Sequence, residues 1–441
     1  MANEAAKNTS LSAFDAHHPP AQEIMDKCVH CGFCLPVCPT YVLWREEMDS
    51  PRGRIYLMKM AQEGTAKMND EWVGHFDSCL GCVACMTACP SGVDYGKLIE
   101  ATRSQIERNH NRSLGEKLHR KLLFETLTRP DRLDFLRWPL LAYQKSGARA
   151  LLRSTGLFKL FPQFVGAMDA LLPKLAAKEA LAETTPARGE KRKRVGLLLG
   201  CVQRAFFSPV NAATARVLAS EGYEVVAPRE QPCCGAMFVH AGEEARAQEL
   251  ARTTIDAFER ANVEYIISNA AGCGSTLKEY GHLLRDDPVY AERAKRFSAK
   301  CRDVCEVLVE APPRSERKPI PARAALHDSC HLQHAQGVRT QPRSLLAQIP
   351  GLELLELPES AVCCGSAGIY NLVQPEAATA LGDRKASFIA SVRPSVVVTG
   401  NPGCIFQLQA ALGRANQRVP VLHTIQLLDA SIRGVSLESL Q

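Results

Sequence analysis

The chain has 441 residues, a formal net charge of +6, and ordinary shares of hydrophobic and charged residues, 46% and 23%. This length supports two to four domains with buried cores, and the composition excludes a wholly disordered or fibrous protein. The positive charge is too small to indicate a nucleic-acid partner, and no recognition motif suggests one. Cysteine is the unusual residue, because eight of the 18 cysteines lie within the first 89 residues.

The N-terminal segment, residues 1–20, is predicted to be a flexible polar tail, since it lacks the apolar stretch of a signal peptide. We therefore expect the protein in the reducing cytoplasm, where clustered cysteines bind metal more often than they form disulfides. One uncharged stretch, Pro394 to Gly413, has two glycines and a proline between Gly400 and Gly403. It predicts a strand, a turn and the start of a helix rather than a membrane span.

Two cysteine runs dominate the next segment, residues 21–110. Each has the spacing Cys-x2-Cys-x2-Cys-x3-Cys-Pro, starting at Cys28 and at Cys79, which is a ligand pattern of bacterial iron–sulfur proteins. Three thiolates on one tight loop can reach one cubane cluster, and the fourth, where a helix starts, reaches the other. We expect two [4Fe–4S] clusters, the first held by Cys28, Cys31, Cys34 and Cys89, and the second by Cys79, Cys82, Cys85 and Cys38.

Zinc and disulfides are weaker alternatives for these runs, because structural zinc usually takes its ligands from two separated pairs. The 40 residues between Cys38 and Cys79, with a helical pattern from Ile55 to Glu63, favour a helical ferredoxin domain over the small βαβ type. His30 and His75 lie close to the runs. Since eight cysteines already satisfy two cubanes, we expect these histidines at the surface or beside the ligands.

Residues 111–194 are predicted to form a helical connector that ends in a basic linker. The segment is rich in leucine and is divided by prolines. Its basic run, Arg188 to Arg194, has the composition of a nuclear-localisation or polyanion-binding signal. A solvated linker before a buried strand is the preferred interpretation.

The C-terminal half is an internal duplication, with domains predicted at residues 195–320 and 321–441. Its cysteine landmarks recur with offsets of 129, 130 and 131 residues. Each copy alternates apolar strand candidates with helix-like stretches, which indicates α/β units with parallel strands. The predicted strands are Val195 to Leu199, Tyr265 to Ser268, Ala324 to Leu326 and Val396 to Thr399, and the predicted helices are Glu243 to Asn262 and Pro375 to Val392. The predicted fold class is α+β multidomain, with an N-terminal α-helical ferredoxin domain followed by duplicated α/β Cys-Cys-Gly domains.

Each copy brings four thiols together if its strands are neighbours, and four thiols can bind a cluster. The glycine after each cysteine pair permits a sharp turn. The alternative is a packed turn of small buried residues that was inherited through the duplication. The candidate metal ligands are Cys201, Cys233, Cys234 and Cys273 in the first copy and Cys330, Cys363, Cys364 and Cys404 in the second.

Further histidines and cysteines surround these motifs. His327, His331 and His334 are spaced to share one helix face, either as ligands or as an incidental cluster. Cys301 and Cys305 lie outside both motifs. Their spacing predicts two spare thiols on one helix turn rather than a metal site.

Together these motifs resemble the iron–sulfur subunit of glycolate oxidase (glycolate dehydrogenase). The resemblance extends from about residue 21 to about residue 430 and includes more than the cysteines. The stretches that favour the glycolate branch are Cys28 to Cys34, Pro51 to Leu57, Asn211 to Leu218 and Cys363 to Gly368. Related families are the iron–sulfur subunits of anaerobic glycerol-3-phosphate dehydrogenase and of lactate-utilisation systems, and the heterodisulfide reductase subunits.

One departure concerns the last cysteine of each copy. In the heterodisulfide reductase branch a fifth thiol stands three residues before it, and five cysteines hold a non-cubane cluster that does chemistry. Here the corresponding residues are Ala270 and Asn401. The departure argues against such a catalytic cluster and leaves open whether these domains hold one or two ordinary additional iron–sulfur clusters or none.

The resemblance implies an electron-transfer subunit that is not catalytic alone and has no catalytic residues of its own. No G-x-G-x-x-G follows a strand, so no flavin or nicotinamide site is indicated. The expected partners are a FAD-containing catalytic subunit and a second flavin-domain subunit, which oxidise glycolate to glyoxylate, and a quinone or other acceptor. Such an acceptor is compatible with peripheral attachment to the cytoplasmic face of the inner membrane. The alternatives are the iron–sulfur subunit of a lactate or glycerol-3-phosphate dehydrogenase, and a heterodisulfide-reductase-like enzyme acting at the Cys-Cys-Gly domains.

Overall fold

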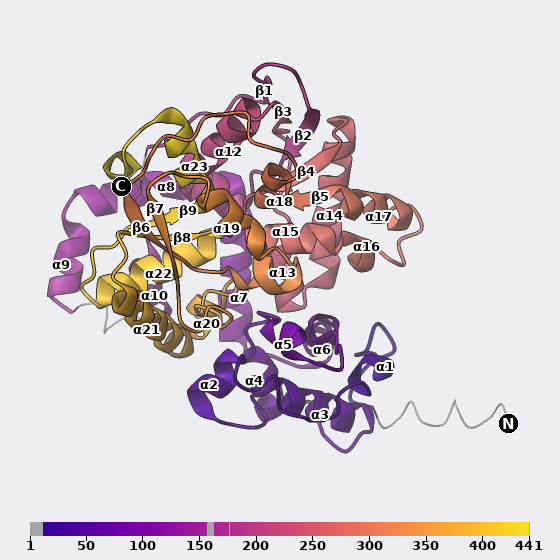
Figure 1. Cartoon of the computed structure of the whole chain (residues 1–441). Coiled ribbons are helices and arrows are strands. Elements are labelled where there is room, and N and C mark those ends of the chain that lie inside the picture. Colours follow the sequence, from indigo (N-terminus) through magenta and orange to yellow (C-terminus); the bar gives the residue numbers. More distant parts are fainter. Residues whose placement is uncertain (1–11, 157–162, 176, 441) are drawn as a thin grey trace.

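A computed structural model describes residues 12–156, 163–175 and 177–440. A helical N-terminal region lies beneath two α/β regions, and a helical connector joins it to them (Figure 1). This arrangement confirms the predicted fold class.

The N-terminal region is built from short helices around the cysteine loops. Its helices are α1 (Gln22–Met25), α2 (Pro39–Trp44), α3 (Pro51–Gln62), α4 (Asp70–Asp77), α5 (Ala84–Ala88) and α6 (Tyr95–Asn109). Helix α3 starts where Pro51 fixes the first turn and the Ser50 hydroxyl accepts a hydrogen bond from Gly53 N. It buries Ile55 and Met58 against the cysteine loops. The helix predicted from Ile55 to Glu63 is the C-terminal part of α3.

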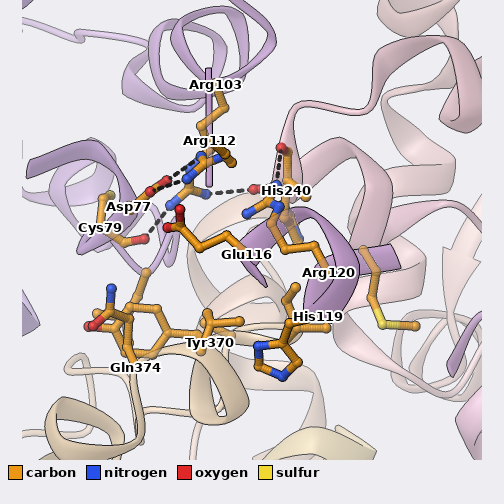
Figure 2. A pocket seen from close by; sticks show the side chains of 16 residues that line it. Asp77, Cys79, Arg103, Arg112, Glu116, His119, Arg120, His240, Tyr370 and Gln374 are labelled. Atoms are coloured by element: carbon orange, nitrogen blue, oxygen red, sulfur yellow. Dashed lines mark hydrogen bonds and ion pairs between the residues drawn. The ribbon is translucent and has the colours of Figure 1, made fainter. Parts of the chain in front are cut away.

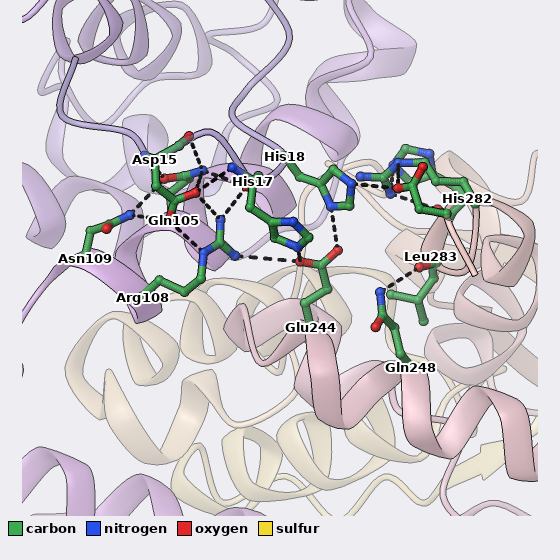
Figure 3. Close-up of polar contacts among 12 residues, drawn as sticks. Asp15, His17, His18, Gln105, Arg108, Asn109, Glu244, Gln248, His282 and Leu283 are labelled. Carbon is green, nitrogen blue, oxygen red and sulfur yellow. Dashed lines mark hydrogen bonds and ion pairs between the residues drawn. The ribbon is translucent and has the colours of Figure 1, made fainter. Parts of the chain in front are cut away.

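The described part of the predicted tail, residues 12–20, lies against the protein (Figure 3). The Asp15 carboxylate accepts a hydrogen bond from Arg108 Nε at 2.9 Å. His18 Nδ1 lies 3.0 Å from Glu244 Oε1. These contacts link α6 to α14 (Glu244–Arg260) of the first α/β region. The tail prediction for residues 1–11 falls outside the described residues.

The connector contains α7 (Leu114–Leu127), α8 (Pro130–Lys145), α9 (Ala148–Ser154) and α10 (Gln163–Leu171). Helix α7 begins with a reciprocal cap, in which the Ser113 hydroxyl accepts from Glu116 N and the Glu116 carboxylate accepts from Ser113 N. The described connector is helical up to Leu171, as its leucine pattern predicts, whereas the described residues from 172 to 194 contain no helix and include strand residues of β1 and β2.

The two repeats contain equivalent sheets. The first sheet has the order β1-β3-β2-β4-β5, and the second has the order β7-β6-β8-β9. All pairings are parallel except that of β1 with β3. The strands are β1 (Thr184–Thr185), β2 (Lys193–Leu197), β3 (Tyr223–Val226), β4 (Tyr265–Ser268), β5 (Cys301–Asp303), β6 (Ala322–Leu326), β7 (Leu352–Glu356), β8 (Val396–Thr399) and β9 (Val421–His423). In both repeats the first parallel strand, β2 or β6, lies inside the sheet, so the strand order reverses beside it. Such a switch point commonly binds ligands.

Helices cover these sheets and join the repeats. The first repeat contains α11 (Cys201–Phe206), α12 (Ser208–Ser220), α13 (Ala236–Ala241), α14, α15 (Ala271–Lys278), α16 (Tyr280–Leu283), α17 (Ala291–Lys300) and α18 (Val304–Val309). The second contains a π-helix (His331–Ala335), α19 (Thr340–Leu346), α20 (Tyr370–Val373), α21 (Pro375–Val392), α22 (Pro402–Arg414), α23 (Thr424–Arg433) and a terminal 3-10 turn (Leu437–Leu440). Val195 and Leu197 share one buried core with Leu326 and Val398, so the two sheets stabilise each other.

Several predicted elements have the observed bounds. The predicted strands Tyr265 to Ser268 and Val396 to Thr399 are β4 and β8, and the predicted helix Pro375 to Val392 is α21. The uncharged stretch from Pro394 to Gly413 forms β8, a turn and most of α22, as predicted. Across the described residues, no helix has the length and apolar character needed to cross a bilayer.

Candidate metal centres

The two cysteine runs have the same backbone course. In each run, the residues immediately before and after the second cysteine adopt left-handed conformations. These residues are His30 (φ 53°) and Gly32 (φ 86°) in the first run, and Gly81 (φ 62°) and Val83 (φ 51°) in the second. A left-handed residue on each side of this cysteine curls the loop tightly. His30 and Val83 adopt this conformation although it is strained for residues other than glycine. The same loop is therefore built twice.

The structure brings Cys38 to the thiols of the second run. Burial, followed by the neighbouring thiols of Cys82, Cys79, Cys38 and Cys34, raises the pKa of Cys85 well above its ordinary value. Cys28, Cys34 and Cys89 pack against the core that also contains Cys79 and Cys85. This placement agrees with the crossed ligand sets, whose individual assignments stay predictions.

A buried arginine supports both loops around the second run. The Arg54 side chain is fully buried and donates to the Asp49 carboxylate at 3.1 Å and to Ser78 Oγ at 2.8 Å. Although burial acts to raise it, Arg54 and Arg103 together lower the pKa of the Cys79 thiol. These cations therefore favour the thiolate, the form that binds iron.

Sequence reasoning missed both arginines. The signal for Arg54 was its position on α3, because it precedes Met58 by four residues and so lies on the buried face of the helix. An arginine on an otherwise apolar helix face needs buried partners. Arg103 gave no comparable local signal, since it donates to the Cys79 and His240 carbonyls, which come from distant segments.

A cavity of about 170 Å³ adjoins Cys79, where the N-terminal region meets α7 and both repeats (Figure 2). Its three arginines, Arg103, Arg112 and Arg120, are all engaged in hydrogen bonds with neighbouring carbonyl or carboxylate groups. Pockets for organic ligands usually measure roughly 300 Å³ or more. We therefore assign this crevice no organic cofactor.

In the first repeat, the cysteines follow three adjacent parallel strands. Cys201 follows β2, the Cys233–Cys234 pair follows β3 and Cys273 follows β4. The carboxyl ends of parallel strands meet at one edge of a sheet, so the four thiols gather there. Cys233 Sγ lies 3.4 Å from Cys201 Sγ. Although a hydrogen bond with Cys233 acts to lower it, the Cys273 thiol and burial raise the pKa of Cys234 well above its ordinary value.

The second repeat places its cysteines in the same way after β6, β7 and β8. Cys330 Sγ lies 3.9 Å from Cys363 Sγ. A ring nitrogen of His327 and the sulfurs of Cys364 and Cys404 lie within 4.8 Å of one another, and all three residues are buried. Four thiols in a buried, largely apolar setting suit iron–sulfur ligation in both repeats.

Glycine is required after each cysteine pair. Gly235 and Gly365 have φ values of 82° and 94°, which side chains other than glycine rarely adopt. A Cβ atom at Gly365 would also lie 2.8 Å from the carbonyl oxygen of Ala378. The predicted sharp turn is confirmed in both copies.

The second run lies beside the second repeat. Cys82, Leu80 and Ala84 share a buried apolar cluster with Cys363, and Cys330 packs against it. The first-repeat cysteines Cys201, Cys233 and Cys234 belong to another cluster, formed by their own repeat. The second cysteine run is thus nearer to the cysteines of the second repeat than to those of the first.

The neighbouring histidines and spare cysteines differ from their predictions in part. His327 ends the strand region, whereas His331 and His334 lie on the π-helix, so the three do not share a helix face. Cys301 lies in β5 and Cys305 in α18, not on one helix turn, because the Asp303 cap starts a helix between them.

The histidines near the cysteine runs lie beside the ligand loops, as predicted. His30 O accepts a hydrogen bond from Arg52 at 2.8 Å. His75 Nδ1 lies 3.1 Å from the Asp49 carboxylate.

Comparison with known families covers most of the chain. The family model described as "4Fe-4S dicluster domain" matches residues 24–93. "Glycolate oxidase iron-sulfur subunit, linker region" matches residues 115–181, and "Cysteine-rich domain" matches residues 195–278 and 324–409. These matches identify iron–sulfur clusters as the cofactors that the gathered thiols fit.

Individual relatives agree along nearly their whole length. The "Probable glycolate oxidase iron-sulfur subunit" of Bacillus subtilis is 38% identical over 91% of this chain and 92% of its own. The "Glycolate oxidase iron-sulfur subunit" of Escherichia coli is 37% identical over 93% of this chain and 95% of its own. "Lactate utilization protein A" of an Exiguobacterium species is 28% identical but covers only 54% of this chain. The chain therefore belongs to the family of glycolate oxidase iron–sulfur subunits.

Proposed function

We propose that this chain is the electron-transfer subunit of a glycolate oxidase complex. It would relay electrons from flavoprotein subunits that oxidise glycolate to glyoxylate towards a quinone-type acceptor. The observation that supports this proposal most strongly is the pair of matched cysteine loops with Cys38 among the thiols of the second run. Two adjacent cluster sites suit the transfer of electrons better than a purely structural role.

The proposed ligand sets are the crossed ones. Cys28, Cys31, Cys34 and Cys89 hold the first [4Fe–4S] cluster, and Cys79, Cys82, Cys85 and Cys38 hold the second. Each repeat holds a further cluster at the site that its four cysteines form. The bound clusters would supply reversible one-electron oxidation and reduction, at potentials set by hydrogen bonds, charge and solvent exposure.

The residues around the second run control those three factors. Gly81 N donates to Cys79 Sγ at 3.4 Å, and Tyr95 Oη donates to the same sulfur at 3.8 Å. Arg54 adds a buried positive charge nearby. These groups stabilise negative charge on the ligands, so they favour the reduced state of this site.

The two runs differ in their access to a partner. Cys31 is exposed, and its neighbours Val29 and Phe33 are 67% and 66% exposed. Cys79, Cys82 and Cys85 are buried. The first run is therefore the side of the N-terminal region that is open to a FAD-containing catalytic subunit or to the second flavin-domain subunit.

The proposal is tested by metal analysis and by activity with and without partners. Two clusters give about 8 iron atoms per chain, and each further four-iron cluster adds about 4. Replacing Cys28 with serine should remove one cubane and stop electron flow in the complex, whereas Cys301→Ser, a buried thiol outside every motif, should leave both unchanged. Glycolate oxidation or disulfide reduction by the isolated chain would contradict the proposal.

A further inference from the structure

His327 occupies the position that Leu198 occupies in the first repeat. Leu198 N donates to Ile267 O at 2.9 Å, and His327 N donates to Val398 O at 2.8 Å. Each residue directly follows the central strand of its sheet, and each stands three residues before the first cysteine of its repeat. The two backbones are therefore equivalent at this point, and the side chains can be compared directly.

The two side chains have different relations to the cysteines. Leu198 is 2% exposed and packs with Cys201, Cys233 and Cys234 in an apolar cluster. His327 is also 2% exposed, yet its Nδ1 has no hydrogen-bond partner. Burying an imidazole nitrogen without a partner is unfavourable. A group that bonds to this nitrogen would therefore stabilise the fold.

The same imidazole is directed at the thiols. One of its ring nitrogens and the sulfurs of Cys364 and Cys404 all lie within 4.8 Å of one another. Asn401 Nδ2 also donates to Cys404 Sγ at 3.5 Å, whereas the equivalent residue in the first repeat is Ala270. The second site thus has a nitrogen donor and a sulfur-directed amide, and the first has neither at these positions.

We infer that His327 is a nitrogen ligand to iron in the second Cys-Cys-Gly site, which makes the two repeats chemically different centres. The first site is an all-thiolate centre, and in the second the His327 imidazole takes the place of one of the four thiolates. Neutral imidazole is a good ligand for iron. Because it carries no charge, imidazole in place of thiolate raises the reduction potential of an iron–sulfur centre. This inference rests on the proposed cluster in the second repeat.

The test uses the full chain, purified without oxygen and labelled with ¹⁵N-histidine. Pulsed electron paramagnetic resonance (EPR) of the reduced protein should show a strong hyperfine coupling from a coordinated ¹⁵N nucleus. The chain has 12 histidines, so assignment needs single-site variants. The coupling should vanish in His327→Leu, which places the first-repeat residue in the second repeat, and also in His327→Gln. It should persist in His331→Gln, whose side chain bonds to Ser275 and the Gly81 carbonyl.

A second readout is the reduction potential. In His327→Leu the centre that remains should titrate at a lower potential than in the unmodified chain. Iron analysis of Cys363→Ser tests the proposed cluster in the second repeat separately from its histidine ligand. If that variant loses iron but the unmodified chain shows no strong ¹⁵N coupling, the inference is overturned while the proposed cluster stands. If Cys363→Ser and Cys364→Ser lose no iron, or if zinc occupies the site, the proposed cluster and the inference both fail.

Discussion

At the scale of single residues, Arg54 is the side chain on which the second cysteine run depends most. Its guanidinium is fully buried between the loop that follows Cys38 and the loop that precedes Cys79. It donates to the Asp49 carbonyl at 2.6 Å and to the Asp49 carboxylate at 3.1 Å. Removing one partner of a buried ion pair leaves the other charge without compensation.

We therefore expect Arg54→Met to lower the free energy of unfolding by about 3–5 kcal/mol and to weaken retention of the second cluster. Urea unfolding followed by circular dichroism, with iron analysis, measures both effects. Arg52→Met is the matched control for the second cluster, because Arg52 lies on the same helix but pairs with partly exposed Glu47 and contacts the first run instead, at His30 O. Such a pair contributes up to about 1 kcal/mol. Equal losses in the two variants would contradict the role assigned to Arg54.

The Glu100 carboxyl group makes the stability of the folded chain depend on pH. Burial, followed by the nearby Glu279 carboxylate, raises the pKa of Glu100 from 4.5 to about 8. Between these values the unfolded chain is ionised while the folded chain keeps its proton. The stability that the protonated Glu100 contributes is therefore fully present below pH 4.5 and is lost as the pH rises towards 8. The side chain is 34% exposed, so water screens part of the effect.

We expect Glu100→Gln to flatten the decline of the melting temperature between about pH 6 and pH 8, the upper part of this window. Glu116→Gln is the control, because hydrogen bonds from Ser113 lower the pKa of Glu116, which places its titration below this range. An unchanged slope in Glu100→Gln would refute the assignment.

At the scale of elements, Gly242 joins the N-terminal region to the first repeat. It ends α13 with a φ of 82°, and a Cβ atom there would lie 2.4 Å from the backbone carbonyl of Arg103 in α6. Alanine would strain the backbone and push α6 away from α13. Gly92 is a matched control, since its φ is 63° but a Cβ atom would meet open space.

We expect Gly92→Ala to cost on the order of 1 kcal/mol through backbone strain alone. Gly242→Ala should cost clearly more, because the collision adds to the same strain. Urea unfolding measures the difference, and faster proteolysis between α6 and the first repeat would show where the structure loosens. Equal effects of the two substitutions would mean that the α6–α13 contact can adjust freely.

The elements that could be predicted from the sequence are those with a local cause. Strands β4 and β8 are short apolar runs followed by turns, and both were predicted with their observed bounds. The start of α18 also had a local signal, since Asp303 and Glu306 form a reciprocal cap. Overlooking that cap led to the wrong prediction that Cys301 and Cys305 share a helix turn.

The candidate metal centres also combine features that have a local cause in the sequence with features that do not. Cysteine spacing and the duplicated landmarks are local patterns, so they could predict the candidate cysteine ligands in the two runs and both repeats. The positions of Arg54, Arg103 and His327 relative to those thiols depend on how separate segments pack. Helix periodicity indicates that Arg54 is buried, but it does not show which thiols lie beside any of these three residues.

At the scale of the whole molecule, the two repeats are equivalent in fold but not in location. Cys82 shares a buried cluster with Cys363, and His331 Nε2 lies 3.1 Å from the Gly81 carbonyl. Thr87 Oγ1 lies 2.7 Å from His334 Nδ1. The second cysteine run is therefore held against the second repeat by polar and apolar contacts.

This asymmetry predicts a magnetic coupling between two specific sites. Two paramagnetic clusters that lie close together broaden or split each other's EPR signals, and the effect falls steeply with distance. In the fully reduced protein, Cys363→Ser should remove the broadening from the signal of the second run. Cys233→Ser is the matched change in the first repeat and should leave that signal unaltered. If both substitutions sharpened the signal equally, the two repeats would be equally near to the second run, contrary to the packing of Cys82 against the second repeat.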